Sequence, residues 1–432
     1  MTFKLNINKN KLIIGTIILL LEILLCIFTY YSINAICGII LYTVGYVALT
    51  VFYIYEERKK IVNIKTVFIG LYSLMIGISP IVYCLTDFKV QETLYYQFPI
   101  FLLGYLCLIF GFNFQMVKKS EKVKNDNYDA MKIFAIIILC VSLLANILFF
   151  SKNMELFLSG DLENARIDAQ AGNGAIIAIG SLIFPSIGML YYCYKNGVEC
   201  KKVLIFALIV FIILNIIKGS RTPIVKMVLL IVLIFNNYKK INFKKIFRIG
   251  IYILIILVAL QVLRNCMSGL NSNFFTEMKN ILINGSINFN YIYKTFPGKV
   301  NFQHGYSYLI NFIMLRPGSD PDFTLWLKDI IGLSYAGGGL TPTLVGESYL
   351  NFGIIGIILS MILTGVLGNF LNERYFDKES CPFWISYLIV TFIDMFRGGF
   401  ANIELNLLTV LILYTSYKIF KEKIFYLRRK NE

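Results

Sequence analysis

Apolar stretches close to 20 residues long recur along most of this chain, and short connections rich in lysine and arginine separate them. A helix of about 20 apolar residues crosses the hydrocarbon core of a bilayer, because it rises about 1.5 Å per residue and satisfies its backbone hydrogen bonds internally. Hydrophobic residues make up 57% of the 432 residues. The pattern therefore predicts an all-α polytopic membrane protein and excludes a soluble domain built around one core.

The spacing of these stretches predicts about twelve transmembrane helices. The expected spans are about 12–30, 35–55, 66–86, 97–117, 132–150, 175–194, 203–217, 222–238, 249–263, 348–370, 383–396 and 405–419. Most of the 41 Lys and Arg residues fall in alternate connections, and cytoplasmic loops carry the excess of these residues in membrane proteins. We therefore expect both termini in the cytoplasm. The same bias explains the net charge of +16 without a nucleic-acid partner.

Three regions follow from the spans. Residues 1–263 hold spans one to nine with short loops, residues 264–347 form one large extracytoplasmic loop with surface helices, and residues 348–432 hold spans ten to twelve and a basic cytoplasmic tail. The large loop is rich in Tyr, Phe and Trp. Such side chains suit either a membrane interface or the apolar faces of sugar rings. Both interpretations remain open at this point.

Several cations are expected near the outer membrane surface, against the usual charge bias. Arg221 and Lys226 lie at the start of the eighth span, and Arg264 follows the ninth. A guanidinium binds phosphate through two parallel hydrogen bonds and stays charged at any relevant pH. The three residues are therefore candidates for a lipid pyrophosphate pocket. The alternative is that each side chain reaches out to lipid head groups.

Two ionisable residues in and beside the large loop are candidates for acid–base chemistry. His304 is the only histidine of the chain and stands in NFQHGYSYL. Glu347 follows Gly346 at the entry to the tenth span, where an unpaired carboxylate is costly. It is expected either to pair with an arginine or to transfer a proton. Asp394 and Arg397 lie three residues apart on one predicted helix, so they can neutralise each other.

No metal site is expected from the sequence. The nine cysteines lie almost entirely inside predicted spans and form no CxxC pair, so neither a zinc site nor a disulfide framework is indicated. The SDPD segment at 319–322 imitates a metal-binding pair of aspartates. Its prolines favour a turn instead.

Four segments resemble a known family. The segments HGYSYLINFIMLRPG (304–318) and GGGLTPTLVGESYLNFGIIG (337–356) are similar to the pattern of the oligosaccharide repeat-unit polymerases, the Wzy-type O-antigen and capsule polymerases. In that pattern a G-x-S-Y/F step, an Arg-containing proline turn and a T-P-x-x-x-G-E-x-Y-x-N-F-G block occur in this order. Ser220–Thr222 resembles the Ser-Arg step that these proteins share with O-antigen ligases, and FRGGF (396–400) resembles their late RG motif.

The resemblance covers roughly residues 160–402, with one departure. The residue eleven positions after Arg166 is Ile177, whereas the family pattern has an R-x10-G spacing at this place. No role is therefore carried over to Arg166.

The resemblance implies a GT-C-like membrane glycosyltransferase that uses no nucleotide sugar, metal or other cofactor. Such an enzyme polymerises undecaprenyl-pyrophosphate-linked oligosaccharide repeat units by transferring the growing glycan onto a new lipid-linked unit. The reaction takes place at the outer face of the cell membrane, and its product is the O-antigen of lipopolysaccharide, a capsule or another surface polysaccharide. The expected partners are these lipid-linked oligosaccharides, membrane lipids and a chain-length regulator.

The resemblance also assigns expected roles to residues of this chain. His304 or Glu347 takes the proton of the acceptor hydroxyl, and only one of them need act. The pyrophosphate leaving group gains negative charge as the donor bond breaks, so fixed cations must stabilise it. Arg221 and Arg264 are the first candidates for this role, joined by Arg316, Arg397 and Lys226.

Two other functions are compatible with the span pattern. An O-antigen ligase or related lipid-pyrophosphate glycosyltransferase shares the chemistry, and a lipid-linked oligosaccharide flippase shares about twelve spans with both ends inside. Transporters often contain repeated halves. No repeat of six plus six spans is evident here. The one large loop follows the ninth span and so does not divide the chain into two equal halves.

Overall fold

A computed structural model of the chain describes most of the helical segments. The described residues are 4–5, 35–56, 63–87, 96–114, 116–117, 127–158, 169, 173–218, 220, 222–241, 273–313, 323–334, 338–376 and 381–431, with single residues and pairs between 248 and 262. This part is helical throughout, apart from a two-residue antiparallel pairing of β1 (Lys4–Leu5) with β2 (Met116–Val117).

Helices occupy the first half of the chain where the apolar pattern predicts them. They are α2 (Ala35–Glu56), α3 (Ile64–Tyr72), η2 (Ser73–Gly77), α4 (Ser79–Asp87), α6 (Phe98–Gly111), α7 (Tyr128–Lys152), α8 (Met154–Leu158), α10 (Gly174–Ser181), α11 (Ile183–Lys195), α12 (Lys201–Ile217) and α13 (Thr222–Tyr238). The bounds of α13 coincide with those of the predicted eighth span. The expected span 12–30 and most of the span 249–263 lie outside the described residues.

The second half adds helices inside the predicted large loop as well as three long terminal helices. They are α15 (Phe274–Thr295), η4 (Tyr306–Leu309), α16 (Ile310–Ile313), α17 (Phe323–Ile331), α18 (Thr343–Phe376), α19 (Pro382–Gly398) and α20 (Glu404–Asn431). Helix α15 packs against α4 and α18. The predicted loop therefore contributes a 22-residue helix to the body of the molecule.

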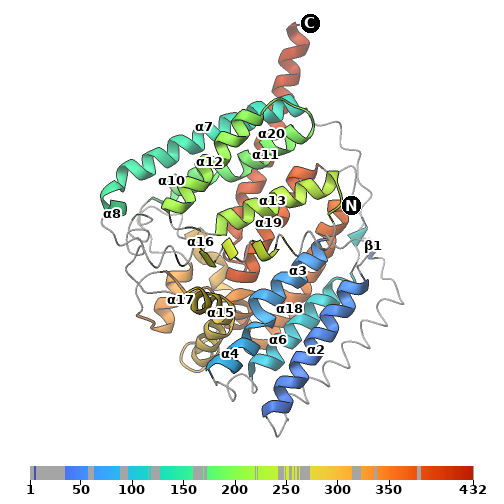
Figure 1. Ribbon diagram of the computed structural model, residues 1–432, viewed down its shortest axis with the longest axis vertical. Coiled ribbons are helices and arrows are strands. Elements are labelled where there is room, and N and C mark those ends of the chain that lie inside the picture. The colour runs from blue at the N-terminus through green and yellow to red at the C-terminus, as the bar shows by residue number, and fades with distance from the viewer. Residues whose placement is uncertain are drawn as a thin grey trace.

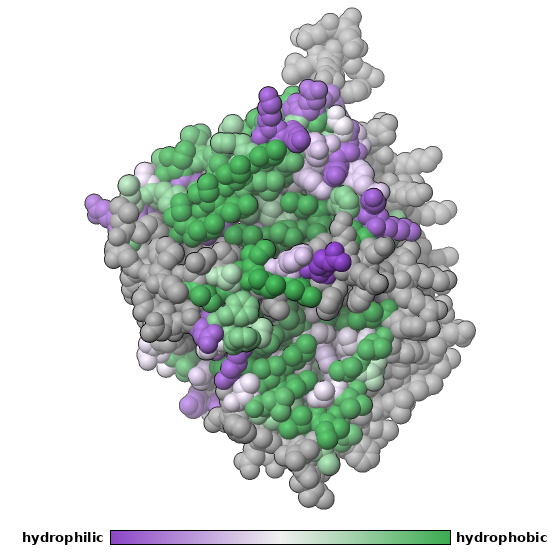
Figure 2. Space-filling view, viewed as in Figure 1, coloured by the Kyte–Doolittle hydropathy of each residue, from purple (hydrophilic) through white to green (hydrophobic). Residues whose placement is uncertain are grey.

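Within the described residues, four helical segments are long and apolar enough to cross a membrane. They are Ile64–Thr86, Tyr128–Lys152, Gly174–Lys195 and Thr343–Phe376, and shorter apolar helices occur at Cys37–Val51, Phe98–Gly111 and Thr222–Tyr238. The number twelve stays a prediction. Large aliphatic side chains cover the outside of several of these helices, for example Leu144 and Ile147 on α7, which are 61% and 63% exposed. Such a surface suits hydrocarbon, and Figure 2 shows it as a broad hydrophobic area over α7 and α12.

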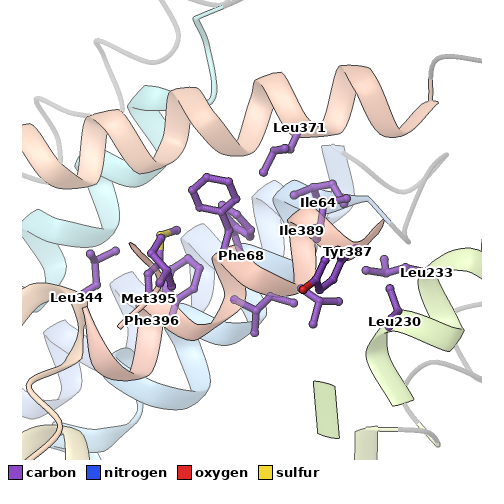
Figure 3. Packing of buried hydrophobic residues seen from close by; sticks show 14 of the residues in the cluster. Ile64, Phe68, Leu230, Leu233, Leu344, Leu371, Tyr387, Ile389, Met395 and Phe396 are labelled. Atoms are coloured by element: carbon purple, nitrogen blue, oxygen red, sulfur yellow. The ribbon is translucent and has the colours of Figure 1, made fainter. Parts of the chain in front are cut away.

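Helix α18 forms the centre of the packing, in contact with α3, α6, α15 and α19. It crosses α6 at two glycines: a methyl group built on Gly111 would lie 2.8 Å from the Cα of Gly365. Small residues at a crossing let two helix backbones come close, which is a main source of packing energy between helices in a membrane. Figure 3 shows Phe68 of α3 beside Phe396 of α19 in this core, with ring centres 5.1 Å apart.

Two groups of helices are visible in the ribbon view. Helices α7, α10, α11 and α12 lie together in the upper part of Figure 1, and α2, α3, α4, α6 and α18 lie together in the lower part. The short element α16 lies at the level between them, and α17 lies lower, at the level of α15. Described parts of the HGYS, GES-Y-NFG and RGGF segments contact one another through Glu347.

Candidate active site

The carboxylate of Glu347 is the polar centre of these contacts. Glu347 is fully buried, on the first turns of α18. Its Oε2 accepts a hydrogen bond from the backbone N–H of Phe400, and its Oε1 accepts one from the N–H of Ala401 at 3.2 Å. The hydroxyl of Ser307 donates to Oε1 at 3.1 Å. We call this arrangement of Glu347, Ser307 and the two backbone amides the carboxylate clasp.

The two amides reach the carboxylate because α19 ends in glycine. Gly399 follows α19 with φ +79° and ψ −175°, a conformation that costs glycine little and other residues much. A methyl group built on Gly399 would overlap the Glu347 carboxylate. The glycine thus provides the turn and also the space for the carboxylate. The RGGF segment supplies backbone donors, a role that its letters alone do not reveal.

The turn at Ser307 is tied to the same helix by a second side chain. Asn351 donates to the Ser307 hydroxyl at 2.7 Å and to the Glu347 carbonyl at 2.9 Å. Its Oδ1 accepts from the N–H of Gly305 at 2.9 Å. Residue 351 lies one helical turn after residue 347, so both side chains face the same way. Glu347 of the GES step and Asn351 of the NFG step, both on α18, therefore hold the HGYS turn in place.

A break in α18 positions His304. Phe352 (φ −140°, ψ 16°) and Gly353 (φ 62°, ψ −145°) leave the helical conformation. Just before the break, the carbonyl of Asn351 accepts from the N–H of His304 at 3.1 Å, and that of Leu350 accepts from the N–H of Gln303 at 3.0 Å. A break at membrane depth needs such partners, because unpaired backbone groups are costly there.

The side chain of His304 is exposed, in contrast to that of Glu347. Its backbone is left-handed, with φ +46°, which is uncommon for a residue with a Cβ and recurs at functional sites. Its ring lies edge to face with that of Phe352, with centres 6.1 Å apart. The imidazole is therefore accessible to a substrate, whereas the oxygens of Glu347 are already engaged.

The GGGLTPT segment before α18 is fastened to the neighbouring elements. The N–H of Leu340 donates to the Thr324 carbonyl of α17 at 2.8 Å, and Asn288 of α15 donates to the Thr341 carbonyl at 2.8 Å. A Cβ on Gly339 would overlap Thr324. Gly339 thus allows the close approach of this segment to α17.

Tyr308 completes the surroundings of the carboxylate. Its ring contacts that of Phe400 edge to face, with centres 6.1 Å apart. Burial raises the pKa of the Tyr308 phenol, and the negative charge of Glu347 raises it further. The phenol therefore keeps its proton at neutral pH.

Two of the predicted cations are among the described residues. Lys226 of α13 forms an ion pair with Asp394 of α19, a partner that the spacing within α19 does not indicate. Arg397 is exposed, and its Nη1 donates to the Thr222 hydroxyl at 2.7 Å. These contacts join the start of α13 to the end of α19. Arg221 precedes Thr222 but, like Arg264 and Arg316, lies outside the described residues.

The structure therefore brings Glu347 close to the His304 turn and to the segment after Arg397. It adds Ser307, Asn351 and Gly399, to which the sequence analysis assigns no role. The G-x-S-Y step contains Ser307 and the NFG step contains Asn351. The sequence shows these motifs but not the contacts that the two side chains make. The described residues contain no group of three His, Cys, Asp or Glu side chains placed to hold a metal ion.

Comparisons with known proteins bear on this arrangement. The family model of the O-antigen polysaccharide polymerase Wzy matches residues 13–423. An uncharacterised protein of Methanocaldococcus jannaschii is 27% identical over 191 residues, which are 44% of this chain and 50% of the archaeal protein. The chain thus aligns with half the length of that relative. No solved structure matches the chain. Since the family match extends over nearly the whole sequence, the chain belongs to the Wzy family of O-antigen polysaccharide polymerases.

Proposed function

We propose that this protein polymerises undecaprenyl-pyrophosphate-linked oligosaccharide repeat units at the outer face of the membrane. The growing glycan is transferred from its carrier onto the outer sugar of a new lipid-linked unit. The observation that carries the proposal is the convergence of three separate segments, HGYS, GES-Y-NFG and RGGF, on the Glu347 carboxylate. The family match covers all three.

In this proposal His304 is the general base. The acceptor hydroxyl loses its proton to the imidazole as its oxygen attacks the anomeric carbon of the donor glycan. The bond from that carbon to the pyrophosphate oxygen breaks, and undecaprenyl pyrophosphate leaves with the electron pair. His304 suits this role because its ring is exposed and a left-handed backbone turn holds it beside α18. Glu347 is the positioning residue that fixes the two turns around it.

Guanidinium groups stabilise the leaving pyrophosphate in the proposed mechanism. Arg397 stands at the end of α19, just before the amides that bind Glu347, and it donates a hydrogen bond to Thr222, the residue that follows Arg221 in the sequence. We assign Arg397 and Arg221 to this role, because guanidinium groups provide fixed positive charge where negative charge develops, which is the role a metal ion has in other phosphate chemistry. Arg264 and Arg316 remain candidates for the same pocket. Lys226 already has Asp394 as a counterion and is assigned to joining α13 and α19.

A host strain that lacks this gene tests the function. If the chain is the polymerase, the strain exports glycans of a single repeat unit, and the wild-type gene restores long chains. His304→Ala, expressed at the same level in the membrane, leaves the glycan at one unit. Repeat units trapped on the inner side would instead identify a flippase. Polymer that accumulates on its lipid carrier would identify a ligase.

A further inference from the structure

A lateral apolar groove lies between α7 and α12. Its volume is about 680 Å³, within the roughly 300–1,000 Å³ typical of small-molecule sites. Leu143, Ile147 and Phe150 line it from α7, and Phe206, Val210 and Leu214 line it from α12. Among them Ile147 and Phe206 are 63% and 56% exposed. The groove therefore opens toward lipid.

The groove follows the last turns of both helices. On α12 its lining extends from Phe206 to Ile217, which is about 16 Å at 1.5 Å per residue. This is about half the thickness of the hydrocarbon core, or one leaflet. A hydrocarbon chain in one leaflet therefore matches the groove in length and in chemistry.

A cation stands at the end of this groove. Lys218 follows α12 and donates from its Nζ to the Asn146 Oδ1 at 2.6 Å. The ammonium lies 5.1 Å from the ring centre of Phe149 and 5.5 Å from that of Phe150. Asn146 and Phe150 both line the groove. Among the described residues no ion pair is formed by Lys218, so an anionic head group complements this end of the groove.

The loop of Lys218 leads directly to the candidate active site. Thr222 lies four residues after Lys218, and four residues of chain span at most about 14 Å. Thr222 accepts the hydrogen bond of Arg397. The backbone of Lys218 therefore lies no more than about 14 Å from that of Thr222, the residue to which Arg397 donates.

We infer that the α7–α12 groove binds the polyprenyl tail of a diphosphate-linked substrate and that Lys218 contacts its diphosphate. The inference rests on the proposed function for its substrate class. An ordinary membrane phospholipid is the competing occupant, because it also combines a hydrocarbon chain with a phosphate. The two differ in their response to carrier length and in competition for the groove.

The first experiment compares carriers of different length in a purified polymerisation assay. Leu214→Trp fills the groove, so kcat/KM for a repeat unit on an undecaprenyl chain falls by about tenfold or more. The value for the same unit on a short geranyl chain changes by less than about twofold. Val210→Trp serves as a second variant in case the first folds poorly. Equal loss on both carriers, or no loss on either, would overturn the inference.

Ile212→Trp is the matched control. Ile212 lies on α12 and is 44% exposed but does not line the groove, because two residues along a helix turn the side chain by about 200°. This variant keeps wild-type values with both carriers. A loss equal to that of Leu214→Trp would assign the effect to bulk on the helix surface and would contradict the inference.

The second experiment measures binding without catalysis and so separates the groove from the proposed function. A photoreactive benzoylphenylalanine at position 210 of the full chain in nanodiscs is expected to label added undecaprenyl diphosphate. Lys218→Met lowers the labelling several-fold, and excess phosphatidylglycerol does not compete. Equal competition by phosphatidylglycerol would identify a general lipid site and overturn the inference. If the wild-type chain makes no polymer in the polymerisation assay, the proposed function is wrong. The labelling still shows whether the groove binds undecaprenyl diphosphate.

Discussion

The carboxylate clasp and the α7–α12 groove differ in almost every physical property. In the clasp a fully buried carboxylate accepts two backbone amides and a hydroxyl. In the groove the lining side chains are apolar apart from Asn146 and Ser151, and Lys218 donates to Asn146. Burying a charge is tolerated only when its hydrogen bonds are satisfied. We therefore expect a substitution in the clasp to reduce activity more than a substitution of similar size in the groove.

This difference corresponds to two requirements of a lipid-linked substrate: its reacting sugar must be held in one geometry, and its long tail must be bound without a fixed conformation. Directional hydrogen bonds fix geometry to a fraction of an ångström, which transfer between two sugars requires. Apolar contact is not directional, so it holds a long flexible tail without selecting one conformation. Substitutions in the clasp should thus affect all substrates alike. Substitutions in the groove should discriminate between carriers.

The largest effect is expected for Gly399→Val. The new side chain overlaps the Glu347 carboxylate and forces a positive φ on a β-branched residue, at a cost of about 1–3 kcal/mol for the backbone alone. We expect polymerisation to fall by at least about 100-fold on long and short carriers alike. The lengths of the glycan chains and the thermal midpoint of the purified protein measure the effect.

Gly298→Val is the control for this variant. Nothing lies within 4 Å of a Cβ built on Gly298, and its φ is not in the left-handed region. Activity and thermal midpoint should therefore stay at wild-type values. Wild-type chain lengths from Gly399→Val would show that the clasp is dispensable.

Glu347→Gln should have the next largest effect. One carboxylate oxygen becomes an NH2 group that faces backbone or hydroxyl donors, so at least one buried hydrogen bond is lost, at about 1–3 kcal/mol. This corresponds to a loss of roughly 10- to 100-fold in kcat. The residual activity should keep the pH profile of the wild type, because His304 is the base in the proposed mechanism. If the activity of the Glu347→Gln variant no longer rises with pH on the acidic side of the profile, Glu347 is the base instead.

Much of the fold could be predicted from sequence because a bilayer imposes a simple rule. Apolar stretches of spanning length become helices, and the expected 222–238 span is α13. The break at Phe352 and Gly353 lies inside the expected span 348–370, and the sequence does not show which turn binds the carbonyls beside it. The sequence predicts surface helices in the large loop without bounds for α15, because the polar residues of α15 hide a face that packs on α4 and α18.

The site was predictable in its residues but not in its contacts. Glu347 was identified because a carboxylate at a span entry is costly, and an arginine or a proton was the expected compensation. The observed partners are backbone amides more than 50 residues away, and a backbone N–H has no letter in the sequence. Only the glycine pair at 398–399 could have signalled a turn able to present them.

The most direct test of the account is a polymerisation assay with the purified full chain in liposomes. The only substrate is a synthetic repeat unit on undecaprenyl pyrophosphate, added to the outer leaflet, and the product is resolved by chain length. The account predicts a ladder of glycans from the wild type and unreacted single units from an equally folded His304→Ala variant. A wild-type protein that leaves the single units unjoined, or a His304→Ala variant that produces the same ladder, would contradict it.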